Sequence, residues 1–206
     1  MKGKVYLVGA GPGDYKLLTL KGLECIKKAD VIVYDRLANK NYLKEAKENC
    51  EFIYVGKASS NHTLPQDDIN RVIADKAKEG KIVTRLKGGD PYVFGRGGEE
   101  GELLKEEGIE FEVVPGITSA IGGLCYAGIP ITHRDHASSF HVITGHLRED
   151  DKENPEINWN ALANTNGTLV FLMGVANLQK ISSNLIKEGK SKDTPVALIS
   201  WATRYN

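Results

Sequence analysis

The residues best suited to chemistry lie in one glycine-rich segment, 85–100, with the sequence RLKGGDPYVFGRGGEE. It follows a short apolar run at 82–84 and holds five glycines, one proline, three basic residues and three acidic residues. A loop that only joins two elements is usually short and needs one or two turn residues. Glycines let a ligand approach the backbone closely, and the charges can bind its polar groups. The segment is therefore predicted to be a ligand-binding loop.

A second glycine-rich segment, GAGPGD at 9–14, follows the apolar run at 4–8. It nearly matches a dinucleotide-binding fingerprint, and Asp35 lies at the end of the next apolar run, where a ribose-binding acid would sit. However, Asp14 replaces the third glycine and Pro12 removes a backbone donor. A carboxylate there opposes the pyrophosphate that the fingerprint holds. We therefore reject an NAD or FAD site, and keep a nucleotide-dependent oxidoreductase only as the rival from another enzyme class.

Seven motifs, in order along the chain, resemble those of the tetrapyrrole methylases. They are GAGPGD at 9–14, LTL at 18–20, YDRL at 34–37, VGK at 55–57, the loop at 87–100, PGITSA at 115–120 and GIPITHRD at 128–135. The resemblance implies S-adenosylmethionine-dependent C-methylation of uroporphyrinogen III to precorrin-2, by two methyl transfers, in sirohaem or cobalamin biosynthesis. The ending GRGGEE at 95–100 favours this tetrapyrrole substrate over those of later corrin-pathway methylases. A methylase acting at another ring position and a non-catalytic binding fragment are the alternatives.

The composition is that of an ordinary globular protein: 206 residues, 41% hydrophobic and 26% charged, with a net charge of +0. This balance gives no sign of a nucleic-acid partner or an anionic membrane surface. No apolar run approaches membrane-spanning length, the start shows no signal peptide, and three scattered cysteines indicate reduced thiols. A cytoplasmic protein is predicted, and the resemblance adds a homodimer.

Apolar runs alternate with helical patterns in the first half of the chain. Strands are expected at 4–8, 31–34, 52–55, 82–86 and 111–114. The alternation predicts an α/β fold with a parallel sheet covered on both faces. Ligands bind beyond the carboxyl ends of the strands in such sheets, and the motif loops fall there.

The dipeptide Pro115-Gly116 is the expected domain junction, with further strands at 140–144, 168–173 and 196–199. The resemblance implies a two-lobed fold with the active site in the cleft between the lobes. The N-terminal α/β lobe is expected at 1–114 and a smaller α/β C-terminal lobe at 115–206. Similar proteins continue beyond the last of these strands, so the second lobe is expected to be truncated.

The resemblance also places cofactor contacts on residues from five segments of the chain. They are Pro12, Gly88, Gly89, Asp90, Val93, Thr118, Ser119, Met173 and Ala202. Asp90 is the only acid among them and is expected to pair with the ammonium or ribose of the cofactor. Turn formation before Pro91 is the alternative for this carboxylate. Ala202 stands where glycine is usual, a change of one small residue for another.

Asp35 and Lys57 follow predicted strands, and a carboxylate–ammonium pair suits proton transfer. The resemblance implies that Asp35 accepts a proton and that Lys57 donates one; a salt bridge or a contact with a substrate carboxylate is the alternative. Arg36, Arg96 and Arg134 suit the substrate's propionate and acetate groups, with a solvated surface position as the alternative for each.

Four histidines, at 133, 136, 141 and 146, invite a metal site. Their spacings fit no common ligand pattern, and methyl transfer needs no metal ion. No metal is expected.

Overall fold

The computed structural model of the chain describes residues 3–56, 65–146 and 157–204. It divides into two compact units, 1–122 with 201–206, and 123–200. The division between these two units falls within helix α4 (Ser119–Tyr126), and the described residues from Trp201 onward belong to the first unit. The lobe boundary expected between residues 114 and 115 stays a prediction.

The first unit is built on a five-stranded parallel sheet with the order β3-β2-β4-β1-β5. Its strands are β1 (Lys4–Gly9), β2 (Val31–Tyr34), β3 (Glu51–Tyr54), β4 (Ile82–Lys87) and β5 (Glu110–Val114). The predicted α/β fold with a parallel sheet is thus confirmed. Because all five strands run the same way, their carboxyl ends, and the loops that follow them, share one edge of the sheet.

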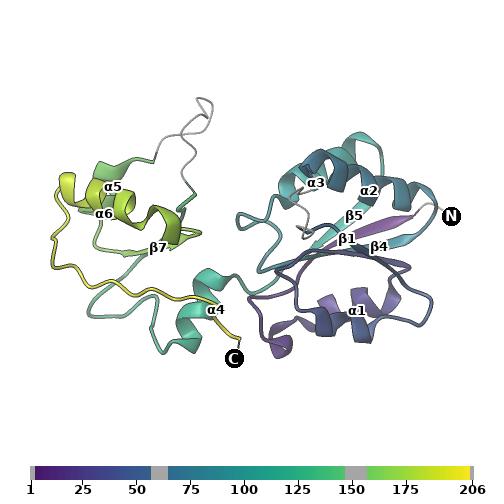
Figure 1. Ribbon diagram of the computed structural model, residues 1–206, viewed down its shortest axis with the longest axis horizontal. Helices are drawn as coiled ribbons and strands as arrows, with labels where there is room; N and C mark the ends of the chain where they lie inside the picture. Colours follow the sequence, from purple (N-terminus) through teal and green to yellow (C-terminus); the bar gives the residue numbers. More distant parts are fainter. Residues whose placement is uncertain (1–2, 57–64, 147–156, 205–206) are drawn as a thin grey trace. The chain divides into compact units, whose positions relative to one another are not determined.

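Helices cover both faces of this sheet: α1 (Leu20–Lys28) lies on one, and α2 (Gln66–Lys78) and α3 (Gly97–Glu106) lie on the other (Figure 1). Two 3₁₀ helices, η1 (Tyr15–Leu17) and η2 (Lys40–Glu45), follow β1 and β2. Alternate strand residues feed two cores, with Val83 packed in the α2–α3 cluster and Leu86 in the α1 cluster. Burial on both faces makes the sheet a rigid base for its edge loops.

The second unit contains the parallel pair β6 (Phe140–Thr144) and β7 (Thr168–Leu172). Its helices are α5 (Trp159–Asn164), η3 (Val175–Asn177) and α6 (Leu178–Lys187). The strand predicted at 196–199 is wrong: that segment is irregular, and Val196 is 75% exposed. A strand is stabilised by a hydrogen-bonded neighbour, and within the described residues this segment has no such ladder.

Among the described residues, every helix is too short or too polar to span a lipid bilayer.

Candidate functional site

The loops after β1, β4 and β5 meet in direct backbone contact at four glycines, which we call the glycine edge: Gly9, Gly11, Gly89 and Gly116. Gly11 N donates to Gly89 O at 3.1 Å, and Gly89 N donates to Gly11 O at 2.8 Å. A Cβ on Gly116 would lie 2.3 Å from Gly89 O, and one on Gly9 would lie 2.5 Å from the Gly116 Cα. Only glycine permits this approach, so the edge presents main-chain groups to whatever binds beside it.

Asp90 organises the loop that follows β4. Its Oδ1 accepts from Tyr92 N at 2.8 Å and its Oδ2 accepts from Gly116 N at 3.0 Å, so it forms a turn and ties two loops together. The turn-forming alternative for Asp90 therefore holds, and its contact with a cofactor stays a prediction. The same loop places Phe94 and Arg96 at φ values of 53° and 59°. Left-handed backbone at non-glycine residues is strained, and such strain gathers in ligand-binding loops.

The loop after β1 is held from two sides. Tyr42 Oη lies 3.1 Å from Ala10 O and 3.2 Å from Asp14 O, and burial raises the pKa of Tyr42 to about 12. Asp14 N donates to Thr203 Oγ1 at 3.1 Å. This last contact places Ala202, the preceding residue, in the unit that carries the glycine edge.

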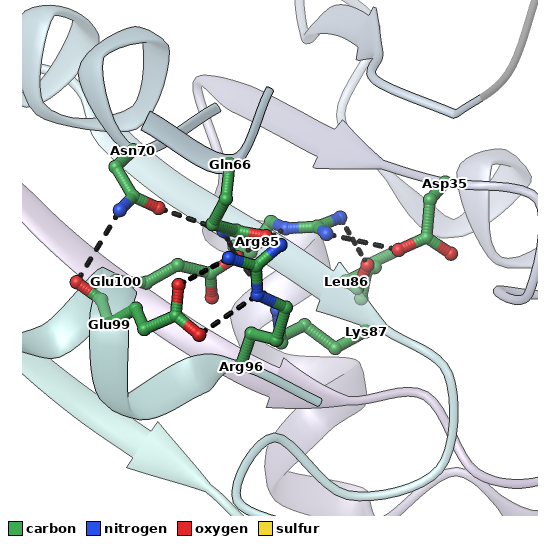
Figure 2. Close-up of polar contacts among 9 residues, drawn as sticks. All are labelled: Asp35, Gln66, Asn70, Arg85, Leu86, Lys87, Arg96, Glu99 and Glu100. Atoms are coloured by element: carbon green, nitrogen blue, oxygen red, sulfur yellow. Dashed lines mark hydrogen bonds and ion pairs between the residues drawn. The ribbon is translucent and has the colours of Figure 1, made fainter. Parts of the chain in front are cut away.

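Asp35 follows β2 and is held by a network of charged side chains (Figure 2). Its Oδ1 accepts from Leu37 N at 2.9 Å, and its Oδ2 accepts from Arg85 Nη2 at 3.0 Å. Arg85 Nε donates to Glu100 Oε1 at 3.1 Å, and Lys87 Nζ donates to the same oxygen at 2.7 Å. Two cations and two carboxylates therefore share one charge-balanced cluster.

This cluster is buried everywhere except at Asp35. The side chains of Arg85 and Lys87 are each 4% exposed and that of Glu100 is 0% exposed, whereas that of Asp35 is 23% exposed. Burial, and then the neighbouring guanidinium of Arg85, lower the pKa of Lys87, while Glu100 acts in the opposite direction. The network thus presents one accessible carboxylate, backed by buried ion pairs.

Most of the predicted cofactor residues lie in the first unit. They are Pro12, Gly88, Gly89, Asp90, Val93, Thr118, Ser119 and Ala202. A Cβ on Gly89 would lie 3.7 Å from Thr118 Cα and 4.0 Å from Ser119 N, so two of these segments are neighbours. Met173 belongs to the second unit and is 57% exposed. After it, Gly174 meets Gly145 backbone to backbone, since a Cβ on Gly145 would lie 2.3 Å from the Gly174 Cα.

The remaining predicted site residues differ in their surroundings. Lys57 lies outside the described residues. The guanidinium carbon of Arg36 lies over the Trp201 ring, 6.0 Å from its centroid, whereas Arg134 lies in an exposed turn of the second unit. Arg96 forms a two-pronged ion pair with Glu99, at 2.9 Å and 2.6 Å, on the surface (Figure 2).

The histidines do not converge on one point. His133 and His136 stack with ring centroids 4.8 Å apart, and the described part of the chain holds no group of three or more potential ligands placed to bind a metal ion.

The buried side chains that hold Asp35 were not predicted from the sequence. Arg85, Lys87 and Glu100 were included in the ligand-binding loop, but β4 runs on to Lys87, and Arg85 and Lys87 lie on the same face as Val83. Two cations at alternate positions near the end of a buried strand were the available signal, because they require a buried acid nearby.

Residues 4–206 match the family described as tetrapyrrole (corrin/porphyrin) methylases. The chain is 57% identical over 201 residues to a uroporphyrinogen-III C-methyltransferase of Priestia megaterium, covering 98% of this chain and 84% of that protein. It is 54% identical over 202 residues to a siroheme synthase of Pseudoalteromonas atlantica, covering 98% of this chain and 43% of that protein. A crystal structure of uroporphyrin-III C-methyltransferase from Thermus thermophilus, complexed with S-adenyl homocysteine, is similar with a TM-score of 0.74 and 40% identity, covering 91% of this chain and 73% of that one.

Proposed function

The chain belongs to the tetrapyrrole methylases, and from this premise we propose that it is an S-adenosyl-L-methionine-dependent uroporphyrinogen-III C-methyltransferase. It adds two methyl groups to uroporphyrinogen III and gives precorrin-2 and S-adenosyl-L-homocysteine, a step of sirohaem or cobalamin biosynthesis. The observation that carries the proposal is the 57% identity to an enzyme of that name over 98% of the chain. Similarity to a structure complexed with S-adenyl homocysteine supports the cofactor.

The glycine edge fits this cofactor. S-adenosylmethionine carries no phosphate but offers an adenine edge, ribose hydroxyls, an ammonium and a carboxylate, all of which main-chain groups can bind. Any side chain on Gly9 or Gly116 would clash with the backbone that forms the edge. We therefore propose that Gly88, Gly89 and Thr118 hold the cofactor through their main-chain groups, while Asp90 fixes the loop through its two backbone hydrogen bonds.

The bound cofactor supplies an electrophilic methyl group on a cationic sulfur. The contribution of the chain is to hold that group in line with a ring carbon, and good orientation can lower such a barrier by about 7–11 kcal/mol. The methylated ring must then lose a proton. We propose that Asp35 accepts it, because Asp35 is the one partly exposed carboxylate of its network and is already oriented by Arg85. Lys57 is proposed as the matching proton donor.

The substrate carries several carboxylates, and Arg36, Arg96 and Arg134 are proposed to bind them. Their guanidinium groups can each pair with a carboxylate through two hydrogen bonds. Arg96 already donates two hydrogen bonds to the Glu99 carboxylate on the surface, so a substrate carboxylate would take the place of Glu99.

An anaerobic assay with reduced uroporphyrinogen III tests the proposal, with mass spectrometry counting the methyl groups added. The wild-type chain is expected to add two. Asp35→Asn keeps the size of the side chain but removes the base, so the rate of the chemical step should fall by about 10²–10⁴-fold, with cofactor affinity little changed. Asp75→Asn, on an exposed position of α2, is the matched control. Methylation of a later corrin precursor but not of uroporphyrinogen III would refute the substrate assignment.

We also propose that the protein is a cytoplasmic homodimer. Three free cysteines, Cys25, Cys50 and Cys125, support a reducing compartment, and membership of the family supports the dimer. Light scattering after size exclusion tests the dimer, and the mass of a single chain would refute it.

A further inference from the structure

Glu100 lies in the first turn of α3 with its side chain fully buried. Its Oε1 accepts from Lys87 Nζ at 2.7 Å, from Arg85 Nε at 3.1 Å and from Gln66 Nε2 at 3.3 Å. Its Oε2 is also buried and has no hydrogen-bond partner among the described residues. One oxygen of one acid is therefore the point at which α2, α3 and β4 meet.

Arg85 transmits this anchoring to Asp35. Its Nε is held by Glu100, its Nη1 donates to Leu86 O at 2.9 Å, and its Nη2 donates to Asp35 at 3.0 Å. All three nitrogens of the planar guanidinium are engaged, which fixes the plane of the group. Figure 2 shows Arg85 between the two acids, with Asp35 on the side away from Glu100. Removing Glu100 would free one side of the guanidinium and let Arg85 turn away from Asp35.

Stability alone does not account for this cluster. Burying charges has a desolvation cost that the ion pairs often fail to repay, and apolar residues of similar volume frequently do as well. The core around the cluster is apolar, with Val83 two residues before Arg85 on the same face of β4. Such local exceptions to an apolar core are expected where a functional group must be positioned.

We propose that Glu100 is a positioning residue that acts on the reaction through Arg85, by aiming the guanidinium that orients Asp35. The inference rests on the proposed function, in which Asp35 accepts a proton from the methylated ring. Glu100 is fully buried, and the proposed function places it in contact with neither the substrate nor the cofactor.

The test is Glu100→Gln, which keeps the shape of the side chain and removes its charge. The kcat for methylation of uroporphyrinogen III should fall at least about 10-fold, because the base is no longer held in the productive geometry. The KM for S-adenosylmethionine, and its affinity by calorimetry, should stay within about twofold, because the glycine edge is unchanged. Glu102→Gln, an exposed position of the same helix, is the control and should match the wild type.

A double-mutant cycle separates positioning from a general structural effect. If Glu100 acts through Asp35, adding Glu100→Gln to Asp35→Asn should change kcat by less than about twofold, since the group that it positions is already disabled. If the double variant instead lost kcat by the product of the two single effects, the inference would be overturned. A folded Glu100→Gln variant with wild-type kcat would also overturn it.

Circular dichroism and thermal melting establish whether the variant folds. If Glu100→Gln does not fold, Arg85→Lys takes its place in the same cycle, because an ammonium keeps the charge but cannot reach both acids in one plane. A wild-type chain that fails to methylate uroporphyrinogen III would overturn the proposed function, and this inference with it. A normal Glu100→Gln beside an impaired Asp35→Asn would overturn only the inference.

Discussion

Replacing Gly116 with alanine tests whether the glycine edge is needed for both folding and cofactor binding. The new Cβ would lie 2.3 Å from Gly89 O and 2.7 Å from the Gly9 Cα, and both neighbours are backbone. Ordinary contact begins near 3.4 Å, so the loops must separate by about 1 Å. No flexible side chain is available to absorb this displacement.

The size of the effect follows from the hydrogen bonds that such a shift would break. Gly116 N donates to the carboxylate of Asp90, a charge-assisted bond that contributes about 1.5–3 kcal/mol, and each bond of the Gly11–Gly89 pair contributes about 1 kcal/mol. Losing the first and one of the pair should lower the free energy of unfolding by about 2.5–4 kcal/mol. The affinity for S-adenosylmethionine should fall at least about 10-fold, because the main-chain groups that bind it are displaced.

Urea denaturation, with and without the cofactor, measures the free energy of unfolding, and calorimetry measures the affinity. The matched control is Gly98→Ala in α3, where a Cβ would meet no atom within 4 Å. That substitution should raise the free energy of unfolding by about 0.5–1 kcal/mol through helix propensity. The expected clash would be refuted if the free energy of unfolding of Gly116→Ala lay within about 0.5 kcal/mol of the wild-type value and its affinity for the cofactor were unchanged.

Two further predictions concern pH. Tyr42→Phe removes the hydroxyl that holds Ala10 and Asp14, and should lower the free energy of unfolding in urea at pH 7 by about 1–2 kcal/mol. Because the pKa of Tyr42 is raised to about 12 in the folded protein, this extra stability of the wild type is present below the unfolded pKa of about 10 and should shrink as pH rises from there. A difference in the free energy of unfolding that stays constant above about pH 10 would contradict this. Asp30→Asn should lower the free energy of unfolding by about 1 kcal/mol at pH 7, because the hydrogen bond from Ile82 N and the pair with Lys47 lower the pKa of Asp30. This stabilisation is present above the unfolded pKa of about 3.9 and lost as pH falls through the folded value, so denaturation near pH 2 should show the two proteins converging.

The sheet of the first unit was predictable because its strands are marked by local apolar runs. The strand expected at 196–199 shows the limit of that signal. The apolar residues Val196 and Leu198 alternate as in a strand, yet both are exposed. An alternating pattern is a property of one segment alone. A strand also needs a neighbouring strand to hydrogen-bond with, and the pattern does not show whether one is present.

The candidate site was likewise predictable only in part. Glycine motifs located the loops, and the carboxylate of Asp90 before Pro91 gave a local turn signal that the structure bears out through Tyr92 N. The ion pair between Arg85 and Glu100 was missed because the alternate cations of β4 indicate a buried acid but do not identify it, and the fold alone brings Glu100 of α3 to Arg85.

The backbone contacts between glycines also restrict how this protein can change over evolutionary time. When a side chain in a core grows, a neighbour that shrinks can often restore the fit. At Gly9 and Gly116, and again at Gly145 in the second unit, the nearest atoms are backbone atoms of another glycine, which has no side chain left to shorten. No single compensating substitution exists at these three positions, so each glycine can only be kept as it is or lost together with the close approach of the two segments that meet there.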